Sequence, residues 1–283
     1  MNDASAPDDA WSETDVTLKG PWFALSFRAR VPAGPTTPDQ LLPLAQALSD
    51  EMVRQACSLE EAAGRRVTCA SGCGACCRGL VAISQVEARH MATLVDAMPD
   101  PRRTAVQARF ADARQRLQAA GLLDRLDAPE TWTPDEFTQM VARYFAAGVP
   151  CPFLEQESCS IYADRPLTCR EFLVTSDPAH CAVLCSPDVV PVTLPLAVFN
   201  AVARWGAGPQ GAFEEQWVPL VVAPDWARAH PDTQAPKAGL ALLQELLACL
   251  SEPGRRQHGA AAARPAAPAA TSGPAGPQGG VQA

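Results

Sequence analysis

Residues 69–77 read CASGCGACC, and this stretch holds four cysteines: Cys69, Cys73, Cys76 and Cys77. Thiolates separated by two or three residues can reach a single metal ion or iron–sulfur cluster. We call this stretch the first cysteine run. The second cysteine run, over residues 151–185, holds five more: Cys151, Cys159, Cys169, Cys181 and Cys185. Nine of the 11 cysteines therefore lie between residues 69 and 185, which predicts a metal-binding region.

The first cysteine run has a second interpretation. Its spacing of i, i+4, i+7 and i+8 would also place four small side chains on one stripe of a helix. Gly72 and Gly74 argue against that helix, because two glycines cost about 2 kcal/mol relative to alanine. Glycine instead lets the backbone wrap closely around a metal, with N–H groups directed at sulfur. We therefore expect an irregular, metal-binding loop.

The second cysteine run contains Pro152 and Pro166, which keep the chain irregular. Proline also orders a loop in advance and lowers the entropy lost when a ligand binds. We expect this run to meet the first one across an intervening helical insert. The sequence predicts a fold that is mainly α with a minor β element (α+β), in which metal closes irregular Cys-rich loops.

Length and composition divide the chain into three parts. The 283 residues, 47% hydrophobic and 19% charged, are sufficient for one large domain or two small ones. Residues 253–283 are mostly Ala, Pro and Gly, so they cannot offset their ordering entropy by burial. We expect a disordered acidic N-terminus over 1–15, a cysteine-cluster domain over 16–252 with its motif core at 69–185, and a disordered tail over 253–283.

Charge and hydropathy exclude several classes of partner. The net charge is −8, and without a basic stripe we expect no nucleic-acid binding. The N-terminus shows no secretory signal, and no apolar run reaches the roughly 18 residues of a membrane span. We therefore expect a cytoplasmic protein, in which clustered thiols stay reduced and serve metal binding or catalysis. Cys76 and Cys77 are also poor disulfide partners, because bridging adjacent residues strains the backbone.

Local patterns predict the individual elements. Alternating apolar residues over 16–31, broken at Lys19-Gly20-Pro21, predict a β-hairpin. Capping boxes begin at Ser84 and Thr133 and predict helices reaching about 98 and 148. Apolar periodicity predicts further helices over 38–63, 101–120, 193–206 and 235–251, and a short strand over 216–222.

Four stretches together resemble a known family: CASGCGACCR, CPFL, CSIYADRPLTCREF and the following Cys181. They are similar to the YkgJ-type cysteine-cluster proteins, whose domain is described as zinc- or iron-chelating and whose members are often named Fe–S oxidoreductases. The resemblance implies eight metal ligands: Cys69, Cys73, Cys76, Cys77, Cys151, Cys159, Cys169 and Cys181. The first gap is three residues here and usually two in the family, which makes Cys69 the least secure of the first four. Cys185 lies outside the family pattern, as a spare ligand or a core thiol.

The number and kind of metal stay open at this point. Four thiolates saturate one Zn²⁺ or one [4Fe–4S] cluster. Either two four-ligand sites exist, or one cluster takes four thiols and the others serve structure or redox chemistry. Thiolate ligands select Zn, Fe or Cu(I) and exclude Mg or Ca as the main occupant. The names given to family members favour iron–sulfur over zinc.

Other polar residues lie close to the expected ligands. A zinc or [4Fe–4S]²⁺ centre with four thiolates carries a charge of −2, which Arg165 and Arg170, and less securely Arg78, are placed to neutralise. Tyr162 could donate a hydrogen bond to sulfur, although a core tyrosine is the ordinary interpretation. His180 precedes Cys181 and could ligate, although a lone histidine is more often not a ligand. No catalytic residue is indicated.

Several functions compete. The first is a protein that binds an iron–sulfur cluster or zinc, with Fe–S oxidoreductase activity as one form of it. The alternative is a structural zinc module for protein interaction, without catalysis. The spacing of Cys69, Cys73 and Cys76 also matches radical-SAM enzymes, but Ala75 stands where those enzymes carry an aromatic residue. Flagellin lysine methylases share a similar cluster, but no glycine-rich SAM loop is visible here. The sequence names no substrate and no protein partner.

Overall fold

The computed structural model describes residues 11–126, 132–205 and 216–251. Helices dominate, and each sheet found in these ranges is a two-stranded antiparallel pair. The expected class, mainly α with a minor β element, is confirmed. The expectations of disorder over 1–10 and over the tail 253–283 concern residues outside the described ranges.

The longest sheet is the hairpin of β1 (Trp11–Gly20) and β2 (Phe23–Pro32), paired along its whole length. Strand β1 begins at Trp11, so the disordered acidic segment expected to reach residue 15 is corrected. The acidic residues Glu13 and Asp15 lie on the outer face, where both pair with Arg28. These acidic side chains therefore form part of the exposed face of a strand and do not indicate a disordered segment.

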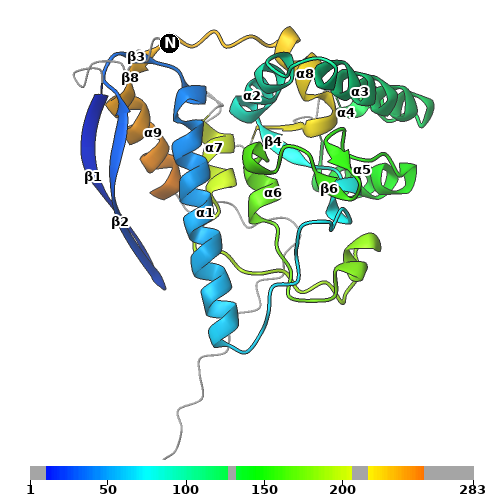
Figure 1. The fold of residues 1–283 in the computed structure, drawn as a ribbon, viewed down its shortest axis with the longest axis horizontal. Helices are drawn as coiled ribbons and strands as arrows, with labels where there is room; N and C mark the ends of the chain where they lie inside the picture. The colour runs from blue at the N-terminus through cyan, green and yellow to red at the C-terminus, as the bar shows by residue number, and fades with distance from the viewer. Residues whose placement is uncertain (1–10, 127–131, 206–215, 252–283) are drawn as a thin grey trace, which may run out of the picture.

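Helix α1 (Pro38–Ala62) is the centre of the first core. It begins at a capping box on Thr37 and ends just before Gly64, whose φ is +74°. The hairpin, α7 (Val198–Trp205) and α9 (Gly239–Ser251) pack around it. Figure 1 shows the hairpin and α9 on one side of α1, and α2 (Gln85–Asp96) and α6 (Leu167–Glu171) on the other.

The second core joins the elements on the other side of α1. Both expected capping boxes are present, at Ser84 and Thr133. The elements are β4 (Ala82–Ser84), α2 (Gln85–Asp96), α3 (Arg102–Ala119), α4 (Leu123–Leu126), α5 (Pro134–Ala147), β7 (Trp217–Pro219), η6 (Leu220–Val222) and α8 (Ala223–Ala229).

Three element boundaries differ from the sequence patterns. Residues 216–222 divide into strand β7 and the 3-10 helix η6. Helix α9 begins at Gly239 because Lys237–Ala238 (β8) pairs with Pro35–Thr36 (β3). Helix α7 begins at Val198, later than the expected 193, because a distant carboxylate accepts hydrogen bonds from its first N–H groups. In the last two cases a long-range partner sets the boundary.

Candidate metal centre

The first cysteine run is irregular, as expected. It lies between α1 and β4 and consists of turns followed by the short 3-10 helix η2 (Cys76–Arg78). Gly72 adopts a φ of +88°, a conformation that favours glycine. A Cβ on Gly74 would lie 2.8 Å from a side-chain carbon of Leu154, so glycine permits the close approach of the second cysteine run.

The second cysteine run is more regular than expected. Cys151 precedes the small hairpin of β5 (Leu154–Glu155) and β6 (Ser158–Cys159). Cys169 lies in α6 (Leu167–Glu171), which corrects the expectation of an irregular loop around Pro166. Pro166 occupies the N-cap of this helix, where its missing N–H removes no intrahelical hydrogen bond. Cys181 lies in the 3-10 helix η5 (Pro178–Ala182).

Backbone hydrogen bonds join the two runs. The N–H of Cys151 donates to the carbonyl of Cys77 at 2.7 Å. The N–H of Val174 donates to Sγ of Cys69 at 3.4 Å, and the N–H of Thr68 donates to the Val174 carbonyl at 3.0 Å. Helix η2 also contacts η5. Segments that are distant in the chain therefore lie side by side, as the metal hypothesis requires.

Burial perturbs several of the thiols of this region. Burial raises the pKa of Cys151 to about 12 and the pKa of Cys169 well above its ordinary value. A hydrogen bond with Cys77, followed by burial, raises the pKa of Cys76. All nine cysteines of the two runs are free thiols. Burial thus disfavours the thiolates, and a cation is the kind of group that can offset this cost.

The three expected arginines have three different roles. Arg78 donates to both carboxylate oxygens of Glu157, at 2.6 and 2.9 Å, and to the Gly74 carbonyl. It therefore fastens the first cysteine run to the β5–β6 turn. Arg170 turns away from the thiols and donates to both carboxylate oxygens of Asp50 at 2.9 Å. Its expected role as a neutralising charge is corrected to a structural one.

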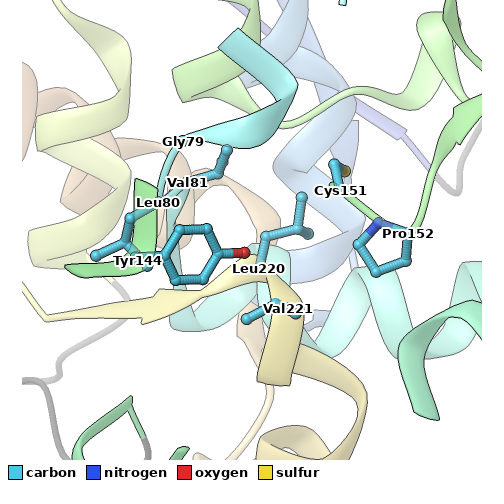
Figure 2. Close-up of a pocket in the computed structure, with 8 residues that line it drawn as sticks. All are labelled: Gly79, Leu80, Val81, Tyr144, Cys151, Pro152, Leu220 and Val221. Atoms are coloured by element: carbon cyan, nitrogen blue, oxygen red, sulfur yellow. The ribbon is translucent and has the colours of Figure 1, made fainter. Parts of the chain in front are cut away.

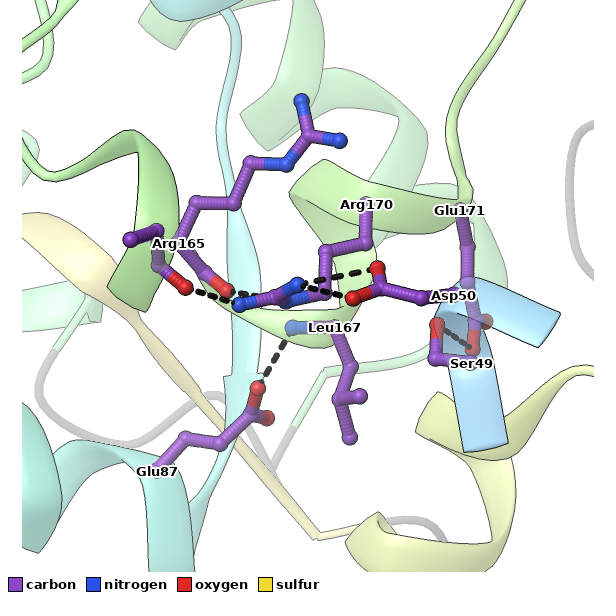
Figure 3. Close-up of polar contacts among 8 residues, drawn as sticks. Ser49, Asp50, Glu87, Arg165, Leu167, Arg170 and Glu171 are labelled. Atoms are coloured by element: carbon purple, nitrogen blue, oxygen red, sulfur yellow. Dashed lines mark hydrogen bonds and ion pairs between the residues drawn. The ribbon is translucent and has the colours of Figure 1, made fainter. Parts of the chain in front are cut away.

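Of the three arginines, Arg165 lies near thiols of both runs, whereas Arg78 lies near Cys77. Burial raises the pKa of Cys69 and of Cys159, and the positive charge of Arg165 opposes that rise in both. The guanidinium lies 4.1 Å from the ring centroid of Tyr162, and Nε is buried without a hydrogen-bond partner among the described residues. Figure 3 shows this guanidinium pointing away from the Arg170 network. Its charge is therefore available to the thiols.

Three other expectations have clear outcomes. Tyr162 is 56% exposed, so it is not the core tyrosine that sequence suggested. Nδ1 of His180 lies 3.2 Å from the Asp188 carbonyl oxygen. Cys185 is exposed, with a φ of +52°, which argues against a core thiol at this position.

Buried carboxylates hold α6, the helix that carries Cys169. Glu87 accepts a hydrogen bond at 2.6 Å from the N–H of Leu167, the first residue of α6. Glu171 accepts hydrogen bonds from Ser49 of α1 and from the N–H of Val198, at 3.0 and 2.9 Å. Burial raises the pKa of Glu171 to about 8. Figure 3 shows the contacts of Glu87 with Leu167 and of Glu171 with Ser49. In the sequence, the one signal for them is Glu171, the acidic residue close to Cys169.

A small cavity adjoins the site on the side of the second core. Figure 2 shows Tyr144 and Cys151 among its lining residues, with the Tyr144 hydroxyl turned toward the Cys151 side. Its volume is about 10 Å³, roughly the space of one water molecule. This cavity is therefore too small for an organic substrate.

Residues 68–186 match the family described as "CxxCxxCC: Putative zinc- or iron-chelating domain". The matched region is less than half of the chain and contains both cysteine runs. The resemblance drawn from the motifs is therefore confirmed, and the match supports metal chelation by this region. No curated protein and no solved structure matches the chain.

Within the described ranges, no three His, Cys, Asp or Glu side chains are arranged so that they could hold a metal ion as they stand. Among the helices of the same ranges, none is long and apolar enough to cross a membrane.

Proposed function

We propose that this chain binds zinc or an iron–sulfur cluster through the eight cysteines Cys69, Cys73, Cys76, Cys77, Cys151, Cys159, Cys169 and Cys181. The observation that carries the proposal is the hydrogen bond from the Cys151 N–H to the Cys77 carbonyl, which joins the two cysteine runs. Thiolates are the ligands that zinc and iron–sulfur clusters prefer. The family match over 68–186 gives independent support.

The donor set and its surroundings fit such a group. Free thiols from both runs supply the ligands, and Arg165 supplies positive charge beside Cys69 and Cys159. Because the thiols do not yet converge, the proposal requires their side chains to turn toward the metal when it binds. Metal binding also requires that the thiols stay reduced, which favours a reducing, cytoplasmic location.

An iron–sulfur cluster would supply one-electron redox chemistry. We favour it because members of the resembled family are often named Fe–S oxidoreductases. The chain's own residues would then set the environment of the cluster. Half-buried Cys151 and Cys169 would limit the access of water, and Arg165 would offset the negative charge of the thiolates.

A structural zinc site without catalysis is the second candidate, and one observation favours it. Cys151 and Cys159 pack against the second core, whereas Leu167, two residues before Cys169, belongs to the first core around α1. A metal bound by these cysteines would cross-link the two cores. Such a site would contribute directly to folding free energy.

Anaerobic purification followed by elemental analysis and EPR spectroscopy tests the proposal. A brown protein with iron and sulfide supports the cluster, and a colourless protein with stoichiometric zinc supports the structural site. Variants Cys57→Ser and Cys249→Ser, outside the proposed ligand set, serve as controls and should retain the metal. The proposal fails if the reduced wild-type protein, supplied with zinc or with iron and sulfide, binds neither.

A further inference from the structure

We infer that the eight cysteines form two neighbouring four-thiolate sites. The first site contains Cys69, Cys73 and Cys181, the second contains Cys151, Cys159 and Cys169, and the adjacent pair Cys76 and Cys77 supplies one further thiolate to each. This inference rests on the proposed function, and it decides between the two arrangements that spacing leaves open. The alternative is one site of four ligands with four spare thiols.

Hydrogen bonds place Cys69 and Cys181 on one side. Thr68, beside Cys69, donates from its hydroxyl to the Ser176 carbonyl at 2.5 Å, and Val174 donates to the Cys69 sulfur. The chain from Val174 leads directly into η5, which carries Cys181. A turn from the Cys73 N–H to the Ala70 carbonyl keeps Cys73 close to Cys69. These three thiols therefore occupy one neighbourhood.

A different set of contacts gathers the second group. Cys151 is bonded to Cys77 through the backbone, and the Cys151 carbonyl accepts from the N–H of Leu154 at 2.9 Å. Leu154 pairs directly with Cys159 across the β5–β6 hairpin. Cys151 and Cys159 also pack against the same core cluster. Cys169 approaches them on α6, whose Thr168 hydroxyl donates to the Ala82 carbonyl at 2.6 Å.

The adjacent pair can serve both sites because of its backbone. In the 3-10 helix η2, consecutive side chains are about 120° apart, so neighbours can contribute to different sites. The Cys77 carbonyl accepts a hydrogen bond from the Cys151 N–H, which brings η2 beside the second site. Helix η2 also contacts η5, which brings the same pair beside Cys181. Arg165, near Cys69 and Cys159, adds positive charge to both sites.

Metal titration of the reduced full-length protein under anaerobic conditions tests the division, with Co²⁺ as the probe. Wild type should bind two equivalents, with the absorption of tetrahedral thiolate coordination. Cys181→Ser and Cys159→Ser should each bind one equivalent, and the double variant should bind none at the same concentration. Cys57→Ser is the matched control, since its thiol is outside both groups, and it should bind two.

Other outcomes separate the two hypotheses. No Co²⁺ binding by wild type would refute the division, and it would refute the proposed function as well if zinc and iron with sulfide also fail to bind. One equivalent in wild type, abolished by either variant, would refute the division and leave metal binding intact. If a variant fails to fold, ¹¹³Cd NMR of wild type decides: two thiolate-bound resonances support the division, and a single resonance overturns it.

Discussion

Replacing Arg170 with methionine is the sharpest test of how α6, the helix that carries Cys169, is held. The Arg170 side chain is 7% exposed and donates to both carboxylate oxygens of Asp50 at 2.9 Å. It also donates to the carbonyls of Arg165, at 2.9 Å, and of Ala163. Methionine keeps much of the stem volume and removes every one of these hydrogen bonds.

The expected cost follows from what remains after the substitution. Removing one partner of a buried ion pair costs about 3–5 kcal/mol, because the other charge is left uncompensated. Here the Asp50 side chain is 51% exposed, so water can solvate the surviving carboxylate. The two carbonyls lose a charged donor, and hydrogen bonds to charged groups contribute about 1.5–3 kcal/mol. We expect Arg170→Met to lower the free energy of unfolding by about 2–4 kcal/mol.

Chemical denaturation at one fixed metal load measures this loss. Arg54→Met is the matched control: Arg54 lies on α1, the helix of Asp50, and pairs with Glu51, but its side chain is 68% exposed. That surface pair should contribute less than about 1 kcal/mol. A double-mutant cycle with Asp50→Asn isolates the coupling between the two partners. Equal losses for Arg170→Met and Arg54→Met would refute the role assigned to Arg170.

Three further predictions concern charge, protonation and packing around the same site. Arg165→Gln should weaken metal affinity about tenfold, since it removes a nearby positive charge, and Arg165→Lys should restore part of that affinity. Unchanged affinity of Arg165→Gln in a chelator competition assay would contradict this prediction. Glu171 has a pKa near 8 when folded, above its ordinary value, so the stability from its bound proton is full below about pH 4.5 and is lost as pH rises through 8. The free energy of unfolding of wild type should therefore fall relative to that of Glu171→Gln between pH 5 and 8.5, by up to about 1.4 kcal/mol per pH unit. Parallel plots of unfolding free energy against pH, measured at equal metal load, would refute this expectation. Gly74→Ala should cost about 1–3 kcal/mol in thermal unfolding because its Cβ would overlap Leu154, and a melting temperature equal to that of wild type would show that the β5–β6 hairpin can withdraw freely.

Local signals in the sequence were sufficient for the scaffold. The alternation over 16–31 predicted the hairpin, and the capping boxes at Ser84 and Thr133 predicted the starts of two helices. Each of these signals involves residues close together in the chain. Helix α6 and the start of α7 could not be predicted in this way. Their N–H groups are satisfied by Glu87 and Glu171, which lie far from them in sequence.

The sequence by itself determined the chemistry of the candidate site. Cysteine identity and spacing decide which donors are available and which metals they suit, because ligand softness belongs to the side chain alone. Only the tertiary structure decided which segments of the two runs lie side by side and which charge accompanies them. The Cys151–Cys77 hydrogen bond joins the runs, and ion pairing to Asp50 turns Arg170 away while Arg165 remains beside the thiols. These choices depend on burial and long-range hydrogen bonds, which residue spacing does not encode.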